Sequence, residues 1–222
     1  MLGAPGNRVA RFLGLFTLRG EGEGRLHARY TFLRGGFPTA NLAVRRAAFE
    51  AVGGFAEEMR TGEDHDLCRR LYAAGFRVRY DPAAVVLHRH RETVEGMLRQ
   101  ALGIGAGQAH LLRRHRPALV VELPGMEWSG GVAGLRCWLN LASADKKVVG
   151  LLLLSAAWPP LALLLPAYVL FLSADMVRRL RREGKGWDLR EATAMAGLHL
   201  LRSAALTAGR WRGSLRHRVL CV

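Results

Sequence analysis

Three carboxylates and a histidine occupy four consecutive positions in the segment GEDHDLCRRL: Glu63, Asp64, His65 and Asp66. One interpretation is structural, because acids in the first turn of a helix cap free N–H groups and oppose the helix dipole. Asp66 also precedes Arg70 by four residues, a spacing at which the two can pair on a helix surface. A second interpretation is catalytic, because one of two adjacent carboxylates can orient the other as a general base. The third is a metal site, and the pattern alone leaves all three open.

A second group of side chains with possible chemistry is His88-Arg89-His90-Arg91. It follows an apolar segment, residues 83–87, that is typical of a short buried strand. Imidazole binds divalent cations, and arginine forms forked contacts with phosphate oxygens. The structural alternatives are a hydrogen-bonded His90 and a solvated basic edge, and both stay open.

The elements that must position these groups alternate between helix and strand. Gly53-Gly54 and Gly75 each follow a run of helical periodicity, as glycine does at a helix end. Alternation of apolar and charged residues then indicates strands, which predicts an α/β layer structure. The predicted elements are a strand at 42–44, helices at 45–52 and 64–74, strands at 76–80 and 83–87, and a helix at 92–116.

Composition narrows the classes of protein. The 222 residues suit one or two domains, and 33 Lys+Arg against 18 Asp+Glu give a net charge of +15. That charge favours phosphate-bearing or membrane-surface partners. The three cysteines are widely spaced and form no CxxC pair, which argues against a zinc ribbon or a disulfide framework and favours a reducing compartment.

The second half of the chain contains an apolar run, residues 148–174, without a single charged residue. It exceeds the roughly 20 residues that cross a bilayer, and Pro159-Pro160 interrupt its middle. We therefore expect either two half-helices that enter the membrane and return or one kinked span, with a buried hairpin of a soluble core as the alternative. Basic residues on both sides of the run give no orientation. The pattern at 191–211 predicts an interfacial amphipathic helix or a plain surface helix.

Three segments in this order resemble the C-terminal part of the catalytic domain of family 2 glycosyltransferases, which have the GT-A fold. They are GGFPTANLAVRRAAFEAVGGF at 35–55, GEDHDLCRRL at 62–71, and GFRVRYDPAAVVLHRH at 75–90. The resemblance implies a partial GT-A layer followed by membrane-associated helices. It divides the chain into the GT-A part (1–117), a linker (118–147), a transmembrane or re-entrant segment (148–174) and a basic amphipathic C-terminal segment (175–222).

The same resemblance implies roles for individual residues in an inverting sugar transfer. Asp64 would be the base that deprotonates the acceptor hydroxyl, with Glu63 as its neighbour, and His88 would help to hold a manganese or magnesium ion. The implied substrate-binding positions are Asn41, Arg45, Gly54, Asp66, Arg70 and Arg89, of which Asp66 and Arg70 have a structural alternative. The implied partners are a nucleotide-sugar donor, a lipid-linked or envelope-glycan acceptor and a membrane, with the catalytic part in the cytoplasm.

The sequence also departs from this family. Only 34 residues precede Gly35, and they contain no aspartate and therefore no DxD motif for the donor diphosphate. We therefore expect a truncated or split glycosyltransferase that is inactive alone unless another chain supplies the nucleotide-binding half. The alternative is a basic membrane-associated or nucleic-acid-binding module without catalysis, although no nucleic-acid-binding motif is present. The segment GIGAGQA at 103–109 resembles a dinucleotide fingerprint but lies inside a helical pattern with no strand before it.

Overall fold

The computed structural model describes residues 2–3, 6–17, 23–30, 36–115, 118–184 and 186–222, and it confirms a mixed α/β protein. Two end residues of expected segments lie outside these ranges: Gly35, the first residue of the segment 35–55, and Arg116, the last residue of the helix expected at 92–116. The helices are α1 (Arg8–Phe16), α2 (Arg46–Ala51), α3 (Glu63–Ala73), α4 (Val94–Arg114), α5 (Ala144–Ala157), α6 (Leu164–Arg182) and α7 (Leu189–His217), with short 3-10 turns η1 (Thr39–Asn41) and η2 (Pro159–Leu163). The strands are β1 (Leu2–Gly3), β2 (Arg25–His27), β3 (Val78–Tyr80), β4 (Leu87–His88), β5 (Ala118–Leu123), β6 (Met126–Gly130), β7 (Arg136–Asn140) and β8 (Leu220–Cys221).

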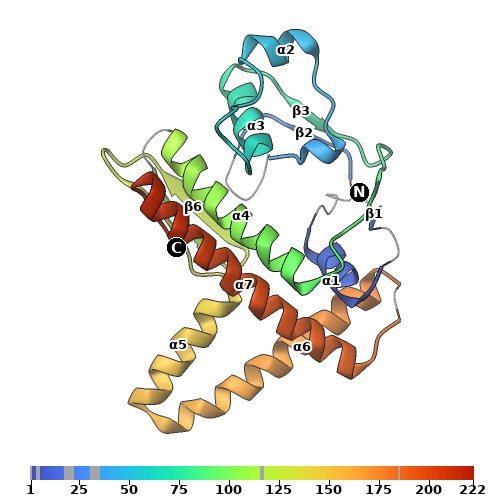
Figure 1. The fold of residues 1–222 in the computed structure, drawn as a ribbon, viewed down its shortest axis with the longest axis vertical. Helices are drawn as coiled ribbons and strands as arrows, with labels where there is room; N and C mark the ends of the chain where they lie inside the picture. The colour runs from blue at the N-terminus through green and yellow to red at the C-terminus, as the bar shows by residue number, and fades with distance from the viewer. Residues whose placement is uncertain (1, 4–5, 18–22, 31–35, 116–117, 185) are drawn as a thin grey trace.

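Helices α4 and α7 run side by side through the centre of the molecule (Figure 1). The unit that carries α2, α3, β2 and β3 lies on one side of this pair, and the α5–α6 hairpin projects on the other. Within the unit, β2 pairs antiparallel with β3, while β4 pairs parallel with β1. The segments that resemble a glycosyltransferase therefore lie on one side of the α4–α7 helix pair.

The glycines of GIGAGQA explain how closely the central helices approach. A Cβ atom on Gly105 would lie 2.2 Å from the carbonyl oxygen of Leu206 in α7. The contact is mutual, because a Cβ on Gly209 would lie 2.2 Å from the carbonyl oxygen of Leu102 in α4. Any side chain at either position would separate the two backbones. The segment thus serves helix packing, as its place inside a helical pattern suggests.

Residues 118–147, expected to be a linker, contain three strands and the start of α5. The strands belong to a four-stranded sheet of order β6-β5-β7-β8. β5 and β6 form an antiparallel hairpin, β5 and β7 are parallel, and the C-terminal β8 pairs parallel with β7 through Cys137 and Leu220. Sequence periodicity did not reveal this sheet because one of its strands comes from the end of the chain, about 80 residues away.

The apolar run forms a helical hairpin. The chain leaves α5 at Trp158, Pro159 and Pro160 lie in η2, and α6 returns to the body of the protein. Among the described residues, the stretch Pro159–Arg182 alone is long and apolar enough to cross a membrane, and 17% of its apolar window is buried. The exposed large side chains of the hairpin are Val149, Leu152, Leu153, Leu154, Trp158, Leu163, Leu164, Val169, Leu170 and Phe171. This exposure contradicts the alternative of a buried soluble hairpin.

Three further expectations differ from the structure. Residues 42–44 form no strand but an irregular segment after η1, and the strand expected at 83–87 is reduced to β4. Helix α7 is longer than expected, and one of its faces is buried in the protein. There Ala192, Met195 and Ala196 pack in one cluster with Met176 of α6 and Phe12 of α1. That apolar face is therefore occupied by protein rather than directed towards lipid.

Candidate active site

The acid pair lies at the beginning of α3. Gly62 precedes the helix in a left-handed conformation with φ 83°, which glycine adopts without strain. Glu63 and Asp64 occupy the first helical turn and are half-buried. One oxygen of Asp64, Oδ1, accepts the backbone N–H of His65 at 2.8 Å. Asp64 therefore contributes to the helix start while part of its carboxylate stays accessible to solvent.

The loop before this turn rests directly on the glycine-rich middle of α4. The hydroxyl of Thr61 donates a hydrogen bond to the carbonyl oxygen of Gly103 at 2.8 Å. A Cβ on Gly107 would lie 2.5 Å from the Thr61 hydroxyl oxygen and 2.6 Å from its carbonyl oxygen. A side chain at position 107 would therefore push away the loop at Thr61, which leads into the acid pair.

Asp66 has a different environment, although it is only two residues away. Its carboxylate is fully buried and accepts from Nε of Arg70 and Nε of Arg114, each at 2.8 Å. Nε2 of His115 lies 3.2 Å from Oδ1 of Asp66. Burial alone would raise the pKa of Asp66, but His115 and the two guanidinium groups lower it to about 2. These contacts favour the structural role of Asp66 over a role in substrate binding.

Arg70 extends the same network to the end of α2. Its guanidinium donates to the carbonyl oxygen of Val52 and, at 2.7 Å, to that of Gly54. Gly54 has a φ of 68°, a left-handed conformation that forms the turn after α2, and its carbonyl oxygen accepts the hydrogen bond from Arg70. The expected substrate-binding residues Gly54, Asp66 and Arg70 therefore lie together, in contacts that fix α2 against α3 and α4.

Sequence analysis missed the aromatic neighbour of the acid pair. The hydroxyl of Tyr30 lies 3.0 Å from Nδ1 of His65, and the guanidinium of Arg69 lies 5.6 Å from the centre of the Tyr30 ring. Burial raises the pKa of Tyr30 and lowers the pKa of His65, the latter against the opposing charges of Asp64 and Glu63. Tyr30 is 35 residues from His65 in the chain and carries no motif, so no sequence signal connected them.

His88 lies in β4, away from any cluster of ligands. Its ring centre lies 4.6 Å from that of His90, and its Nδ1 is buried without a hydrogen-bond partner among the residues that the structure describes. Within the described ranges, no three His, Cys, Asp or Glu side chains come close enough together to hold a metal ion. His88 thus offers one buried nitrogen, but the described residues do not form a complete cation site.

The remaining expected site residues lie at the surface. The side-chain amide of Asn41 donates to the carbonyl oxygen of Ala84 at 2.8 Å and so joins η1 to the loop before β4. Arg45 at the start of α2 and Arg89 after β4 are both exposed. Their guanidinium groups are accessible to an anionic substrate.

Comparison with known proteins identifies the family. Residues 24–175 match the model of glycosyl transferase family group 2. The chain belongs to this family. This confirms the resemblance seen in the three sequence segments, and with it the assignment to a family of transferases.

Curated relatives match shorter stretches. Over 113 residues the chain is 44% identical to a pre-mycofactocin glycosyltransferase of Mycobacterium tuberculosis, an alignment of 49% of this chain and 23% of the relative. It is 31% identical over 75 residues to the probable glycosyltransferase YdaM of Bacillus subtilis (34% and 18% of the two chains). It is 41% identical over 51 residues to the O-antigen chain rhamnosyltransferase WbaN of Salmonella anatum (23% and 16%). The chain thus spans less than a quarter of the length of each relative, and no solved structure matches it.

Proposed function

We propose that this chain forms the acceptor side of an inverting glycosyltransferase, with Asp64 as the general base. One observation carries the proposal: of the three acids in the motif, Asp66 is buried in an ion-pair network, whereas Glu63 and Asp64 remain accessible at a helix start. Ion pairing therefore accounts for Asp66 and leaves the adjacent pair for chemistry. Membership of the glycosyltransferase family supports this assignment.

In the proposed reaction, a carboxylate oxygen of Asp64 accepts the proton of the acceptor hydroxyl. The hydroxyl oxygen attacks the anomeric carbon of the donor sugar, and the bond from that carbon to the diphosphate breaks. The electron pair leaves with the nucleotide diphosphate, and attack from the opposite side inverts the anomeric centre. Glu63 lies next to Asp64 in the first turn of α3. The donor diphosphate would be held by further residues, in a longer form of this chain or in a partner chain.

The α5–α6 hairpin supports a membrane-associated enzyme. Because α6 returns to α7, the basic residues in the first turn of α5 and those at the end of α6 lie at the same, open end of the hairpin. Lys146 and Lys147 thus share one side with Arg178, Arg179, Arg181 and Arg182, whereas in the sequence they flank the apolar run on opposite sides. By the positive-inside rule, this arrangement supports a cytoplasmic location of that end. The proposed acceptor is correspondingly a lipid-linked or envelope glycan, as the name of the Salmonella relative suggests.

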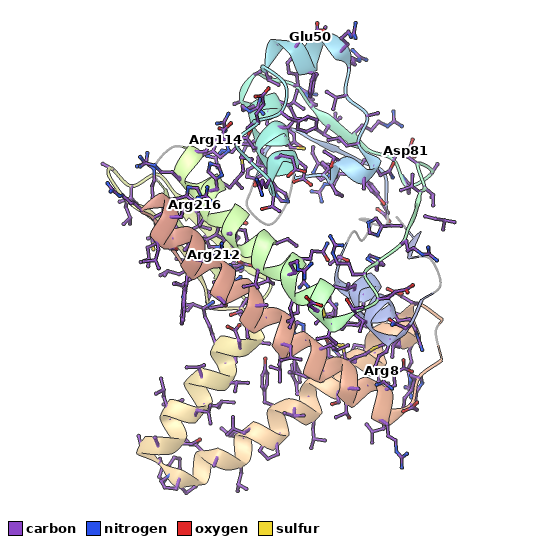
Figure 2. All side chains as sticks on the ribbon, viewed as in Figure 1. Arg8, Glu50, Asp81, Arg114, Arg212 and Arg216 are labelled. Atoms are coloured by element: carbon purple, nitrogen blue, oxygen red, sulfur yellow. The ribbon has the colours of Figure 1, made fainter. Side chains whose placement is uncertain are left out.

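The alternative of a nucleic-acid-binding module has less support. Arg8 at the start of α1 and Arg114 at the end of α4 lie at opposite ends of the helical body, and Arg212 and Arg216 lie on α7 (Figure 2). Nucleic-acid binders gather such charges on one face or stripe. The net charge of +15 is here spread over several elements.

The proposal is tested with the detergent-solubilised full chain, a panel of labelled nucleotide sugars and polyprenyl phosphate-linked acceptors. Asp64→Asn should reduce sugar transfer about 100-fold or more, because a general base typically contributes 10²–10⁴-fold. Glu50→Gln removes an exposed acid from α2 and should leave transfer unchanged. Full transfer by Asp64→Asn would refute the base assignment. Binding of a labelled nucleotide sugar without transfer by the unmodified chain would refute the activity, whereas absence of donor binding would show that the donor-binding residues lie outside this chain. Steep salt-dependent binding of nucleic acid would favour the alternative.

A further inference from the structure

A pocket of about 270 Å³ lies outside the proposed active site, at the base of the hairpin. It is formed by β5, β7, the start of α5 and the middle of α7. Its polar lining residues are Glu122, Asn140, Ser143, His199, Arg202, Ser203 and Arg210. His199, Arg202, Ser203 and Arg210 lie outside the family match at 24–175, and the proposed reaction uses none of the lining residues.

Arg202 is the residue in this pocket that lacks a partner. Its side chain is largely buried, and within the described part of the chain it forms neither a hydrogen bond nor an ion pair. Burial lowers its pKa, and the positive charge of Arg210 lowers it further. The guanidinium of Arg202 thus keeps all its hydrogen-bond donors available on the pocket side of α7.

Arg210 adds a second cation with free donors. Its side chain is 4% exposed, and its guanidinium lies 5.7 Å from the centre of the Trp138 ring. Its Nε donates to Oε1 of Gln108 at 2.7 Å, and no other hydrogen bond from the guanidinium reaches the residues that the structure describes. The terminal nitrogens thus remain available to a ligand.

The nearby acids offset the charge of Arg210 in part, because burial lowers its pKa and the charges of Glu122 and Asp145 oppose that shift. Oε2 of Glu122 accepts from the indole of Trp138 at 3.2 Å and from the amide of Asn140 at 2.5 Å. Oδ1 of Asp145 accepts the hydroxyl of Ser203 at 2.6 Å. Both carboxylates are therefore bound by neutral donors, and neither forms an ion pair with Arg202 or Arg210 within the described residues.

The start of α5 makes the pocket still more positive. Ser143 and Ala144 line the pocket at the N-terminal end of a 14-residue helix, where the helix dipole favours an anion. Lys146 lies beside it, with Nζ 3.2 Å from the Ser143 hydroxyl and 3.3 Å from the Thr207 hydroxyl. Two guanidinium groups and a helix start thus line one small cavity, and an ammonium group lies next to it.

We propose that this pocket binds a phosphate group, and that the phosphate is the head of a membrane lipid. Forked guanidinium groups match the oxygens of phosphate in geometry and charge. The position indicates the lipid source, because α5 runs from the pocket directly into the exposed apolar side chains Leu152 and Leu153. An acyl or prenyl chain attached to the phosphate would continue along this helix. The proposal is independent of the sugar-transfer activity and stands if that activity is absent.

Calorimetric titration of the detergent-solubilised full chain tests the site with three probes: dihexanoyl phosphatidic acid, dihexanoylglycerol and inorganic phosphate. We expect the phosphatidic acid to bind at least about tenfold more tightly than dihexanoylglycerol, in line with charge-assisted hydrogen bonds. It should also bind more tightly than inorganic phosphate. Equal affinity for the two phosphates would assign the site to free phosphate and overturn the lipid source. Equal affinity for the two lipids would overturn phosphate recognition altogether.

Two variants of α7 locate the binding. Arg202→Gln should lose about tenfold or more in affinity for phosphatidic acid. Arg212→Gln removes the same charge from an exposed position on the same helix, and its affinity should stay within about twofold. Without ligand, Arg202→Gln should melt at the same or a higher temperature than the unmodified chain, because Arg202 forms no hydrogen bond or ion pair with the described residues that the substitution would break. Equal losses in both variants, or a lower melting temperature for Arg202→Gln, would refute the assignment.

Discussion

The hydroxyl of Thr61 donates to the carbonyl oxygen of Gly103 at 2.8 Å, and so joins the loop before the acid pair to the middle of α4. The same two α4 turns also contact α7, because Gly105 lies against the backbone of Leu206. One glycine-rich stretch thus packs against the loop before the acid pair on one side and against α7 on the other. The position of Asp64 therefore depends on α4.

Replacement of Gly107 by alanine should displace this loop. The added Cβ would lie 2.5 Å from the Thr61 hydroxyl oxygen and 2.6 Å from its backbone oxygen, so the loop itself must move. Overpacking of this kind costs about 1–3 kcal/mol. We expect a lower melting temperature by circular dichroism and a loss of sugar transfer. Gly197→Ala is the matched control, because a Cβ there meets nothing within 4 Å and should be neutral or stabilising. Equal melting temperatures for the two variants would contradict the role of Gly107.

Loss of the Asp66 carboxylate should destabilise the protein in a pH-dependent way. Because the folded pKa of Asp66 is about 2, below its usual value of 3.8, its contribution is complete above pH 4 and disappears as the pH falls towards 2. The shift corresponds to about 2 kcal/mol. Asp66→Asn should lower the melting temperature at pH 7 and flatten its decrease between pH 4 and 2. If the melting temperature of Asp66→Asn fell between pH 4 and 2 as steeply as that of the unmodified chain, other acids would cause this decrease.

Local patterns identified the elements around the acids but not their contacts. The structure confirms the predicted helix ends at Gly53-Gly54 and Gly75 and the helix that starts with the acids. These features could be predicted because each depends on residues close together in the sequence. The ion pair of Asp66 with Arg70 was also predicted from spacing within one helix. The contacts of Asp66 with Arg114 and of His65 with Tyr30 were not, because they join elements far apart in the chain. The roles of Asp64, Glu63 and His88 in chemistry remain predictions.

Acidification should also destabilise the protein through His199. Its ring stacks on Phe16 with centroids 4.7 Å apart, and burial lowers its pKa to about 4, with the charges of Arg202 and Arg179 acting in the same direction. The unfolded chain then binds more protons than the folded one between pH 6.5 and 4, so stability falls as the pH decreases through this range, by up to about 3 kcal/mol. His199→Gln should reduce the change in melting temperature between pH 7 and 4. If the melting temperature of His199→Gln changed with pH as much as that of the unmodified chain, another titrating group would cause the effect.

Membrane association should depend on the apolar side chains of the hairpin. Leu153 on α5 and Leu163 in η2 are 69% and 75% exposed, and an aspartate at either position would have to enter the bilayer at a cost of about 3 kcal/mol. The double variant Leu153→Asp, Leu163→Asp should shift the chain from the vesicle fraction to the soluble fraction in a flotation assay. Leu215→Asp is the matched control, because Leu215 is 85% exposed but lies on α7, outside the hairpin, and its replacement should leave flotation unchanged. If both proteins floated equally, the hairpin would not be the membrane-binding element. If Leu215→Asp alone abolished flotation, α7 would take that role.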